Sequence, residues 1–297
     1  MRVSVIILNW NGGAEDCLES VQSAVTQDYP NMEVIFVDNG STDNSLQTVQ
    51  GRYPQLRYLA LEKNLGCPEG RNRGAAVADG DLLMFLENDG AWGSTDVVSG
   101  VVAMFTRHPE LGALYTRVDG YRTGATDTPL DPKSHADGVA VISSSFRGGA
   151  SAIRTNVFRS AGGFPGDYIY GGEERYLSWK IYQRGYTVAY WPARAMRHKG
   201  SDYAGKSEMR MRNMFTNDIT TILRLYPWSW LLWYLPGKIA LYGLRFMRKG
   251  RVNEFRANLC SVLKSRPWRH EGQKISVQTL LRVNAIRYGW IARSYAL

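Results

Sequence analysis

The chain has 297 residues, of which 44% are hydrophobic and 21% are charged, and its formal charge is +9. This composition excludes an intrinsically disordered or collagen-like chain, and no internal repeat is present. The length suits one large or two modest domains with a substantial core. The charge is divided unevenly, because residues 1–186 carry 16 basic and 22 acidic side chains whereas residues 187–297 carry 20 basic and 5 acidic ones. We therefore predict an acidic catalytic or binding domain followed by a basic segment that contacts an anionic partner.

Three cysteines, Cys17, Cys67 and Cys260, are odd in number and widely spaced. They fit neither a disulfide framework nor a zinc site, and they favour a reducing, cytoplasmic setting. The N-terminal residues begin a β-branched strand pattern at once and do not resemble a signal peptide. The longest uncharged run, residues 225–237, has 13 residues, whereas a spanning helix needs about 20 apolar residues. We therefore expect no transmembrane segment.

Short apolar runs and helical periodicities alternate along the first two thirds of the chain. Strands are predicted at residues 3–8, 34–37, 56–61, 81–86 and 111–118, with helices at 15–25, 43–53, 69–79 and 95–107 between them. A polar loop at 120–137 precedes strand-like residues 139–143 and 148–153, a helix at 172–184 and a strand at 187–191. Basic and aromatic helices are predicted after residue 198. This alternation is typical of a parallel, doubly wound α/β sheet, in which ligands bind beyond the carboxyl ends of the strands.

Polar residues follow the predicted strands at these ends. Asn9-Trp10-Asn11-Gly12 follows the first strand, and Asp38-Asn39-Gly40-Ser41-Thr42-Asp43 follows the second. The Asp38 carboxylate is able to accept hydrogen bonds from a nucleotide base or a ribose hydroxyl, although an ordinary strand–turn–helix connection explains the same residues. Asn64-Leu65-Gly66 precedes Glu69-Gly70-Arg71-Asn72-Arg73-Gly74, whose arginines lie at a helix start, where phosphates bind. The spacing matches neither a Walker loop nor a Rossmann fingerprint, and a packed loop is the alternative.

Acidic and histidine positions suggest a metal site and a general base. Glu87-Asn88-Asp89 places two carboxylates at a strand end, where Mg²⁺ or Mn²⁺ commonly joins carboxylates to a diphosphate; a solvated acidic turn is the alternative. Glu173-Glu174 opens a helix, and a carboxylate at a helix start suits a general base, although acidic residues are common there. Consecutive helical residues point about 100° apart, so we expect only one of the two to face a given site. His198 follows a strand and is able to bind a metal or a diphosphate, or else lies in the core or on the surface.

Taken in chain order, these motifs together with Gly162-Gly163-Phe164 resemble the family 2 glycosyltransferases with the GT-A fold over residues 3–200, and more weakly to about residue 226. The resemblance implies a Rossmann-like, mostly parallel sheet flanked by helices. It implies a nucleotide-sugar-binding and catalytic domain at residues 1–200 and a helical extension at 201–297. Similarity to rhamnosyltransferase-like bacterial members favours a deoxysugar and a UDP- or dTDP-linked donor.

The resemblance also implies a role for individual residues. Glu174 is the expected catalytic base, and Glu87, Asp89 and His198 are the expected ligands of Mg²⁺ or Mn²⁺. The expected substrate- and nucleotide-binding residues are Asn9, Asn11, Asp38, Asn64, Gly66, Arg71, Asn88 and Glu173. The chain departs from the family at Glu87 and Glu174, where Asp is usual. Tyr176 and Lys180 stand where many relatives have Asp and Arg.

The basic C-terminal segment combines Trp228, Trp230, Trp233 and Tyr234 with the cluster Arg248-Lys249-Gly250-Arg251. Tryptophans and clustered cations are drawn to bilayer interfaces, so we predict a location on the inner face of the cell membrane, where a lipid-linked acceptor is presented. The alternatives are packing of these aromatics against the core or against a second copy in a homodimer. A nucleic-acid partner is disfavoured, because the aromatic stretch has no phosphate-contacting side chains.

The sequence thus predicts a cytoplasmic, peripherally membrane-associated inverting glycosyltransferase. It would transfer a sugar from a nucleoside diphosphate to a hydroxyl of a lipid-linked or cell-surface glycan during polysaccharide biosynthesis for the cell envelope. The alternative from another class is a catalytically idle sugar-nucleotide-binding or assembly protein at the membrane. A nucleotidyltransferase fits less well, because the first loop has no phosphate-activating lysine.

Overall fold

The computed structural model describes residues 1–124, 126, 139–200, 207–269 and 273–288, and only the backbone of 207–211. The strands are β1 (Val3–Asn9), β2 (Met32–Asp38), β3 (Arg57–Ala60), β4 (Leu82–Glu87), β5 (Gly90–Trp92), β6 (Leu111–Gly120), β7 (Val141–Ile142), β8 (Ala150–Arg154) and β9 (Thr187–His198). The helices are α1 (Ala14–Val25), α2 (Ser45–Arg52), α3 (Cys67–Val77), α4 (Val97–Arg107), α6 (Thr155–Ala161), α7 (Glu173–Gln183), α8 (Ser207–Leu225), α9 (Trp228–Met247), α10 (Val252–Lys264) and α11 (Val277–Arg287), with a 3₁₀ turn at Pro267–Arg269. Most of the loop predicted at 120–137 lies outside the described residues.

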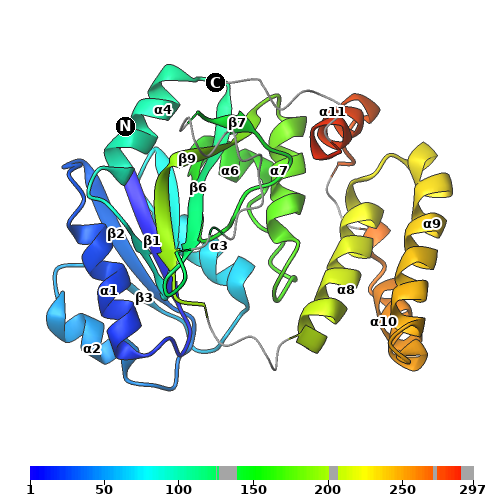
Figure 1. Ribbon diagram of the computed structural model, residues 1–297, viewed down its shortest axis with the longest axis horizontal. Coiled ribbons are helices and arrows are strands. Elements are labelled where there is room, and N and C mark those ends of the chain that lie inside the picture. The colour runs from blue at the N-terminus through cyan, green and yellow to red at the C-terminus, as the bar shows by residue number, and fades with distance from the viewer. Residues whose placement is uncertain (125, 127–138, 201–206, 270–272, 289–297) are drawn as a thin grey trace.

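The strands form one sheet with the order β3-β2-β1-β4-β8-β6-β9-β5, and β7 pairs with β9 beside this path (Figure 1). The strands β1 to β4 are parallel, and their register places Asn9 opposite Asp38 and Leu8 opposite Glu87. The other half is mixed, because β8 runs antiparallel to β4 and β6 while β6 and β9 are parallel. The predicted α/β fold is confirmed, and the antiparallel β8 is the departure from a purely parallel order.

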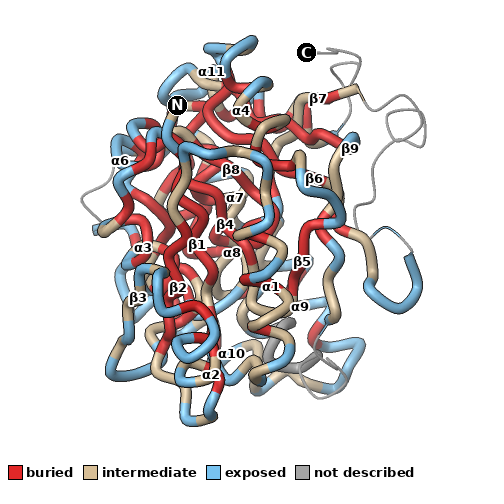
Figure 2. The backbone as a smooth tube through the Cα atoms, turned by 90° about the vertical axis from the view of Figure 1, so that its left-hand side faces the viewer, coloured by how far each residue is buried: buried red, intermediate tan, exposed pale blue. Residues whose placement is uncertain are grey.

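Alternate side chains of the central strands enter two separate cores. Val5 and Ile7 of β1 pack in one cluster with residues of α1, α2 and α4, whereas Ile6 packs in the other with residues of α3, α6 and α7. Figure 2 shows the consequence, with β1 and β4 buried along nearly their whole length. A strand that is covered on both faces by helices reads as a continuous apolar run, which explains the pattern at residues 3–8.

Three short features are missing from the sequence prediction: β5, α6 and the second half of β9. The pattern of β9 was predicted to end at residue 191, but the strand continues through Pro192 to His198. The pairing of β6 with β9 shifts register between Thr116 and Arg117, next to this proline. Because proline cannot donate a ladder hydrogen bond, it usually marks the end or a bulge of a strand, and here it marks a bulge.

The C-terminal helices pack on the same core as the sheet. Phe215, Ile219 and Ile222 of α8 belong to the buried cluster that contains Ile6, as does Val283 of α11. In Figure 1, α8 lies between α7 and α9. Beyond His198 the described residues contain helices and no strand, as predicted. None of the helices in the described part of the chain is long and apolar enough to cross a bilayer.

Candidate active site

The carboxyl ends of β1 and β2 are joined by a network of amide and hydroxyl groups. Asn9 is fully buried, and its Nδ2 donates to Asp38 Oδ1 at 2.9 Å and to Ser45 Oγ at 2.8 Å. Its Oδ1 accepts a hydrogen bond from Asn88 Nδ2 at 3.1 Å. The second oxygen of Asp38 accepts from the backbone N–H of Ser41 at 3.1 Å. Asp38 is therefore fixed in place at the strand end, and Asn9 and Asn88 are among the groups that fix it.

The neighbouring loops are tied to the same strand ends. The buried Asn39 side chain donates to Asn64 Oδ1 at 3.0 Å and to the Gly66 carbonyl at 3.1 Å. Gly66 has a φ of +86°, and an added Cβ would lie 3.1 Å from the backbone of Ile169, so this position requires glycine. On the other side, the exposed Asn11 accepts from the backbone N–H of Thr42 at 2.7 Å.

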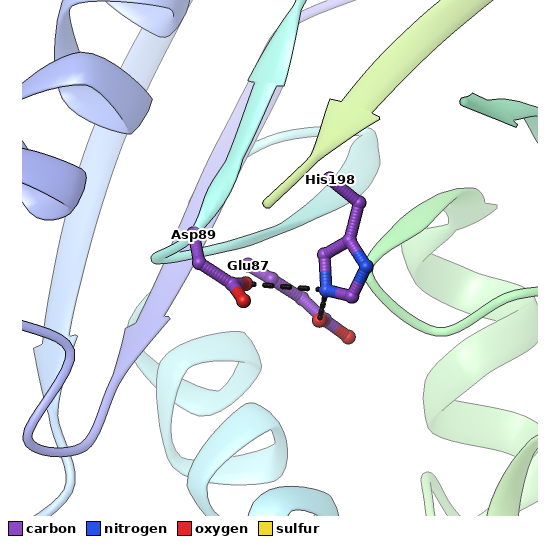
Figure 3. A group of neighbouring side chains, drawn as sticks. All are labelled: Glu87, Asp89 and His198. Carbon is purple, nitrogen blue, oxygen red and sulfur yellow. Dashed lines mark ion pairs between the residues drawn. The ribbon is translucent and has the colours of Figure 1, made fainter. Parts of the chain in front are cut away.

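Glu87, Asp89 and His198 form a compact cluster (Figure 3). Glu87 ends β4, Asp89 lies in the turn that follows, and His198 ends β9, where it is paired with Gly90 of β5. His198 Nε2 lies 3.2 Å from Glu87 Oε2 and 3.3 Å from Asp89 Oδ1. Hydrogen bonds to Asp89 and Glu87 raise the pKa of His198 to about 10. Burial alone would raise the pKa of Glu87, but His198 and Arg71 hold it below its ordinary value.

This cluster fits a divalent cation. One ligand atom from each of Glu87, Asp89 and His198 lies within 4.8 Å of the others. Two carboxylate oxygens and one imidazole nitrogen are ligands that Mn²⁺ accepts, and Mg²⁺ binds through one or two carboxylates. The three predicted metal ligands are thus brought together from β4, its following turn and β9.

Arg71 of α3 links this cluster to the start of α7. Its side chain is 3% exposed; Nη2 lies 3.0 Å from Glu87 Oε1, and Nη1 lies 3.7 Å from Glu173 Oε1. An added Cβ at Gly148 would lie 2.3 Å from Arg71 Nη1, and one at Gly149 would lie 2.2 Å from Glu87 Cγ. The two glycines therefore let the chain before β8 approach both charged groups. The sequence prediction gave them no role, although a glycine pair before a strand signals close backbone approach.

The two glutamates at the start of α7 have different surroundings. Glu173 is buried, and burial together with the Glu174 carboxylate raises its pKa to about 8, despite the Arg71 guanidinium. Glu174 is partly exposed. We predicted that only one of the two faces a given site, and both residues border one cavity. That cavity has a volume of about 530 Å³, wide enough for two side chains that point 100° apart to border it.

Two cavities share Arg147, Gly172 and Glu174 in their linings. The first, of about 530 Å³, is lined among others by Arg71, Glu87, Glu173, Glu174 and His198. The second, of about 390 Å³, is lined by Tyr115, residues 143–147, Gly172, Glu174, Arg175, Trp179 and Arg287. Asn9, Asn11, Asp38, Asn64, Gly66 and Asn88 do not line either cavity among the described residues, and instead form the network at the ends of β1 and β2. The predicted residues thus fall into two groups. Asn88 belongs to the network at the ends of β1 and β2, and the adjacent Glu87 belongs to the group that lines the first cavity.

A cluster of two carboxylates and an imidazole beside a cavity at the carboxyl edge of the sheet lies where open α/β sheets bind their ligands. Residues 4–163, more than half of the chain, match the family described as glycosyl transferase family 2. The chain therefore belongs to glycosyl transferase family 2.

Individual relatives and solved structures agree with this assignment. A stretch of 107 residues is 30% identical to the UDP-Glc:alpha-D-GlcNAc-diphosphoundecaprenol beta-1,3-glucosyltransferase WfaP of Escherichia coli, covering 35% of this chain and 41% of that protein. The structure of GalNAc-T7 with UDP, GalNAc and Mn²⁺ superposes with a TM-score of 0.64 at 18% identity, over 89% of this chain and 57% of that one. The mannosyltransferase PcManGT from Pyrobaculum calidifontis, in complex with GDP-Man and Mn²⁺, gives 0.59 at 18% identity, over 98% and 81%.

At 18% identity the two structures show the fold alone, which is GT-A. The chain spans between 26% and 52% of the length of three further curated relatives that it matches. The family and the fold are thereby established, and the substrates are not.

Proposed function

We propose that the chain is an inverting glycosyltransferase that transfers a sugar from a UDP- or dTDP-linked donor to a hydroxyl of a lipid-linked or cell-surface glycan acceptor. The observation that carries the proposal is one cavity bordered by Glu174 and by two members of the candidate cation cluster, Glu87 and His198. The name of the Escherichia coli relative describes transfer to a diphosphoundecaprenol-linked sugar, which supports a lipid-linked acceptor and a role in cell-envelope polysaccharide biosynthesis. A deoxysugar donor rests on the resemblance to rhamnosyltransferases alone.

We assign donor binding to the ends of β1 and β2. Asp38, Asn11, Asn64 and Gly66 would contact the base and the ribose. Asn9 is fully buried, and both polar atoms of its amide are already bonded, so we give it the role of holding Asp38. Asn88 has the same role through its bond to Asn9.

Glu87, Asp89 and His198 would hold Mg²⁺ or Mn²⁺. When bound, the cation supplies positive charge that balances the charge of a departing nucleoside diphosphate. Arg71 keeps the Glu87 carboxylate oriented through their 3.0 Å contact. Glu173 lines the same cavity, and we assign its carboxyl group to a sugar hydroxyl of the donor.

Glu174 would act as the general base. Its carboxylate takes the proton of the acceptor hydroxyl while that oxygen forms a bond to the anomeric carbon. The bond from the anomeric carbon to the diphosphate oxygen breaks in the same displacement, which inverts the configuration, and positive charge develops on the sugar ring. A position between the two cavities suits this role, because Glu174 borders both.

The proposal is tested by incubating the protein with a panel of nucleotide sugars, Mn²⁺ and lipid-linked saccharides, and measuring nucleotide release and product formation. We expect release with at least one UDP- or dTDP-sugar, and loss of release in Asp89→Asn. The matched control is Asp79→Asn, which changes an exposed aspartate just after the C-terminal end of α3. Nucleotide-sugar binding by the wild type without release or transfer would contradict the proposal and favour the catalytically idle alternative.

We also propose that residues 201–297 place the enzyme on the inner face of the membrane through the outer face of α9. Trp233 is 85% exposed and Leu232 is 75% exposed, and the exposed apolar side chains Leu241, Leu244 and Met247 continue along the helix. Exposed apolar side chains in such a row are uncommon on a soluble surface and are typical of interaction sites. Arg248 and Lys249 follow at the exposed end of the helix, which favours anionic headgroups over a protein partner.

Sedimentation with vesicles tests this location. We expect the protein to pellet with vesicles that contain anionic phosphatidylglycerol, to pellet less with pure phosphatidylcholine, and to stay in solution as Trp233→Glu. The control is Leu263→Glu, at an exposed leucine of α10 outside the row. Failure of the wild type to pellet, or a dimer that Trp233→Glu dissociates, would contradict the membrane and support contact with a second copy.

A further inference from the structure

The cavity of about 390 Å³ on the other side of Glu174 is lined by three arginines and a single carboxylate. Arg147 comes from the chain before β8, Arg175 from α7 and Arg287 from the end of α11. Among the described lining residues, Glu174 is the only acidic one. Three elements that are far apart in the sequence thus bring positive charge to one cavity beside the proposed base.

The charge of Arg175 is only partly balanced. Its Nη2 lies 2.6 Å from Asp218 Oδ1, but the other oxygen of Asp218 lies 3.1 Å from Lys238 Nζ and accepts a 2.8 Å hydrogen bond from the Tyr242 hydroxyl. One buried carboxylate therefore serves two cations. Because the pair is in a largely buried setting, screening by solvent is reduced, and positive potential extends into the cavity.

Two hydrogen-bond donors in the cavity lining lack acceptors. Trp179 is 1% exposed, and its Nε1 has no partner among the described residues. The Nε of Arg175 is likewise buried and without a hydrogen bond, and the guanidinium lies over the Trp179 ring at 5.8 Å. Neither nitrogen is itself exposed to the cavity, and the two residues contribute a cationic, donor-bearing wall to it.

The first cavity shares Arg147 with the second, but neither Arg175 nor Arg287 is among its described lining residues. It has its own cation site at Glu87, Asp89 and His198 and its own buried guanidinium, Arg71. The candidate cation site and Arg71 therefore supply positive charge for a donor diphosphate in the first cavity. The second cavity offers donors and positive charge to a different molecule.

We propose that the second cavity is the acceptor subsite and that it takes an acceptor with an anionic oxygen group, a phosphate or a carboxylate, close to the hydroxyl that Glu174 deprotonates. This inference rests on the proposed glycosyl transfer and names the class of its acceptor. Planar guanidinium groups bind such oxygen pairs in a bidentate manner, which fixes orientation as well as charge. The anion can belong to a diphosphate-linked lipid or to an acidic glycan, and the two share this chemistry.

The first experiment measures the binding of methyl phosphate and glucuronate by calorimetry, with UDP and Mg²⁺ at saturation to fill the first cavity. We expect Arg287→Gln to weaken binding about tenfold, because one charged fork is removed. Arg256→Gln, at an exposed arginine of α10, should bind as the wild type does. Arg147→Gln, at an exposed position that borders both cavities, repeats the test if Arg287→Gln does not fold, with its affinity for UDP and Mg²⁺ measured first. Equal affinities in the wild type and both cavity variants overturn the inference.

The second experiment compares acceptors in the transfer reaction. A short-chain diphosphate-linked saccharide, an oligosaccharide with a uronic acid and a neutral methyl glycoside distinguish the two sources of the anion. We expect Arg287→Gln to raise KM for the accepted anionic substrate about tenfold with kcat unchanged, and a neutral glycoside used as well as the anionic ones overturns the inference. If transfer depends on Glu174 but not on Arg287, the inference alone fails. If the wild type turns over no nucleotide sugar, the proposed function fails and the acceptor role fails with it.

Discussion

The cavity beside β4 and the outer face of α9 both depart from the usual distribution of side chains. The cavity buries a charged side chain, whereas α9 exposes apolar ones. In the cavity, Arg71 is 3% exposed and lies between the carboxylates of Glu87 and Glu173. On α9, Trp233 and Leu232 are exposed over most of their surface. Buried charge and exposed apolar surface both cost stability, so each region is better explained by binding than by folding. The difference is that the charges in the cavity contact one another, whereas Trp233 and Leu232 are exposed in the part of the chain that the structure describes.

The largest expected effect on stability is at Arg71. We expect Arg71→Met to lower the free energy of unfolding by about 3–4 kcal/mol, because the buried Glu173 carboxyl loses its guanidinium partner and the Glu87 side chain, which is 35% exposed, loses one of its partners. Arg73→Met, two residues along the same helix and 56% exposed, should change it by less than about 0.5 kcal/mol. Urea denaturation followed by circular dichroism measures both. Similar values for the two variants would contradict this prediction, because the ion pairs of Arg71 would then contribute no more to stability than those of an exposed arginine.

Two neighbouring leucines of α9 allow a direct comparison between the buried and the exposed face of this helix. Leu231 is 7% exposed and packs in the core, whereas Leu232 is 75% exposed. We expect Leu231→Ala to cost about 2–4 kcal/mol and Leu232→Ala to cost less than about 0.5 kcal/mol. Sedimentation with anionic vesicles should show the opposite order, with the larger loss in Leu232→Ala. A stability loss at Leu232 equal to that at Leu231 would contradict an outer face without partners.

The glycine pair before β8 gives an effect of intermediate size. In Gly149→Ala the added methyl group would lie 2.2 Å from Glu87 Cγ and 2.4 Å from its Oε1, so the Glu87 side chain has to move. We expect the affinity for Mn²⁺, measured by calorimetry, to fall by about tenfold, as is typical when the support of a ligand is disturbed. Gly51→Ala, where an added Cβ meets nothing within 4 Å, is the control. Unchanged Mn²⁺ affinity in Gly149→Ala would count against Glu87 as a ligand.

A different kind of test is the dependence of stability on pH through Glu173. Burial and the Glu174 carboxylate raise its pKa from an ordinary 4.5 to about 8. Between these values the folded state binds a proton that the unfolded state releases, so stability from this group is present at low pH and is lost as the pH rises to about 8. We expect the free energy of unfolding to fall more steeply from pH 5 to pH 8 in the wild type than in Glu173→Gln. Equal slopes in the two proteins would show that Glu173 is ionised throughout this range.

The sequence predicted the ends of the strands better than the contacts between them. Asn9 and Asp38 could be placed at one edge because parallel strands present their carboxyl ends together, and the register confirms this placement. The antiparallel direction of β8 could not be predicted, since a short run of small apolar residues does not encode its pairing partner. Periodicity describes neighbours along one element and carries no information about its direction in the sheet.

The ion pairs of the site could not be predicted either, because a local sequence pattern does not show which distant residues come into contact. Arg71 was expected to contact the nucleotide, but its contacts with Glu87 and Glu173 join residues that are far apart in the sequence. The role of Gly149 depends on where Glu87 points, which no local pattern contains. The cluster of Glu87, Asp89 and His198 was predicted through the family resemblance, and its members do lie together.

The central claim is that Glu174 accepts the proton of the acceptor hydroxyl between the two cavities. The most direct measurement is the initial rate of sugar transfer by Glu174→Gln at saturating donor, acceptor and Mn²⁺, beside Glu110→Gln as a control at an exposed glutamate that lines neither cavity. We predict a loss of about 10²- to 10⁴-fold in kcat for Glu174→Gln, with donor affinity retained, and a wild-type rate for Glu110→Gln. A Glu174→Gln enzyme that transfers sugar at the wild-type rate would contradict the account.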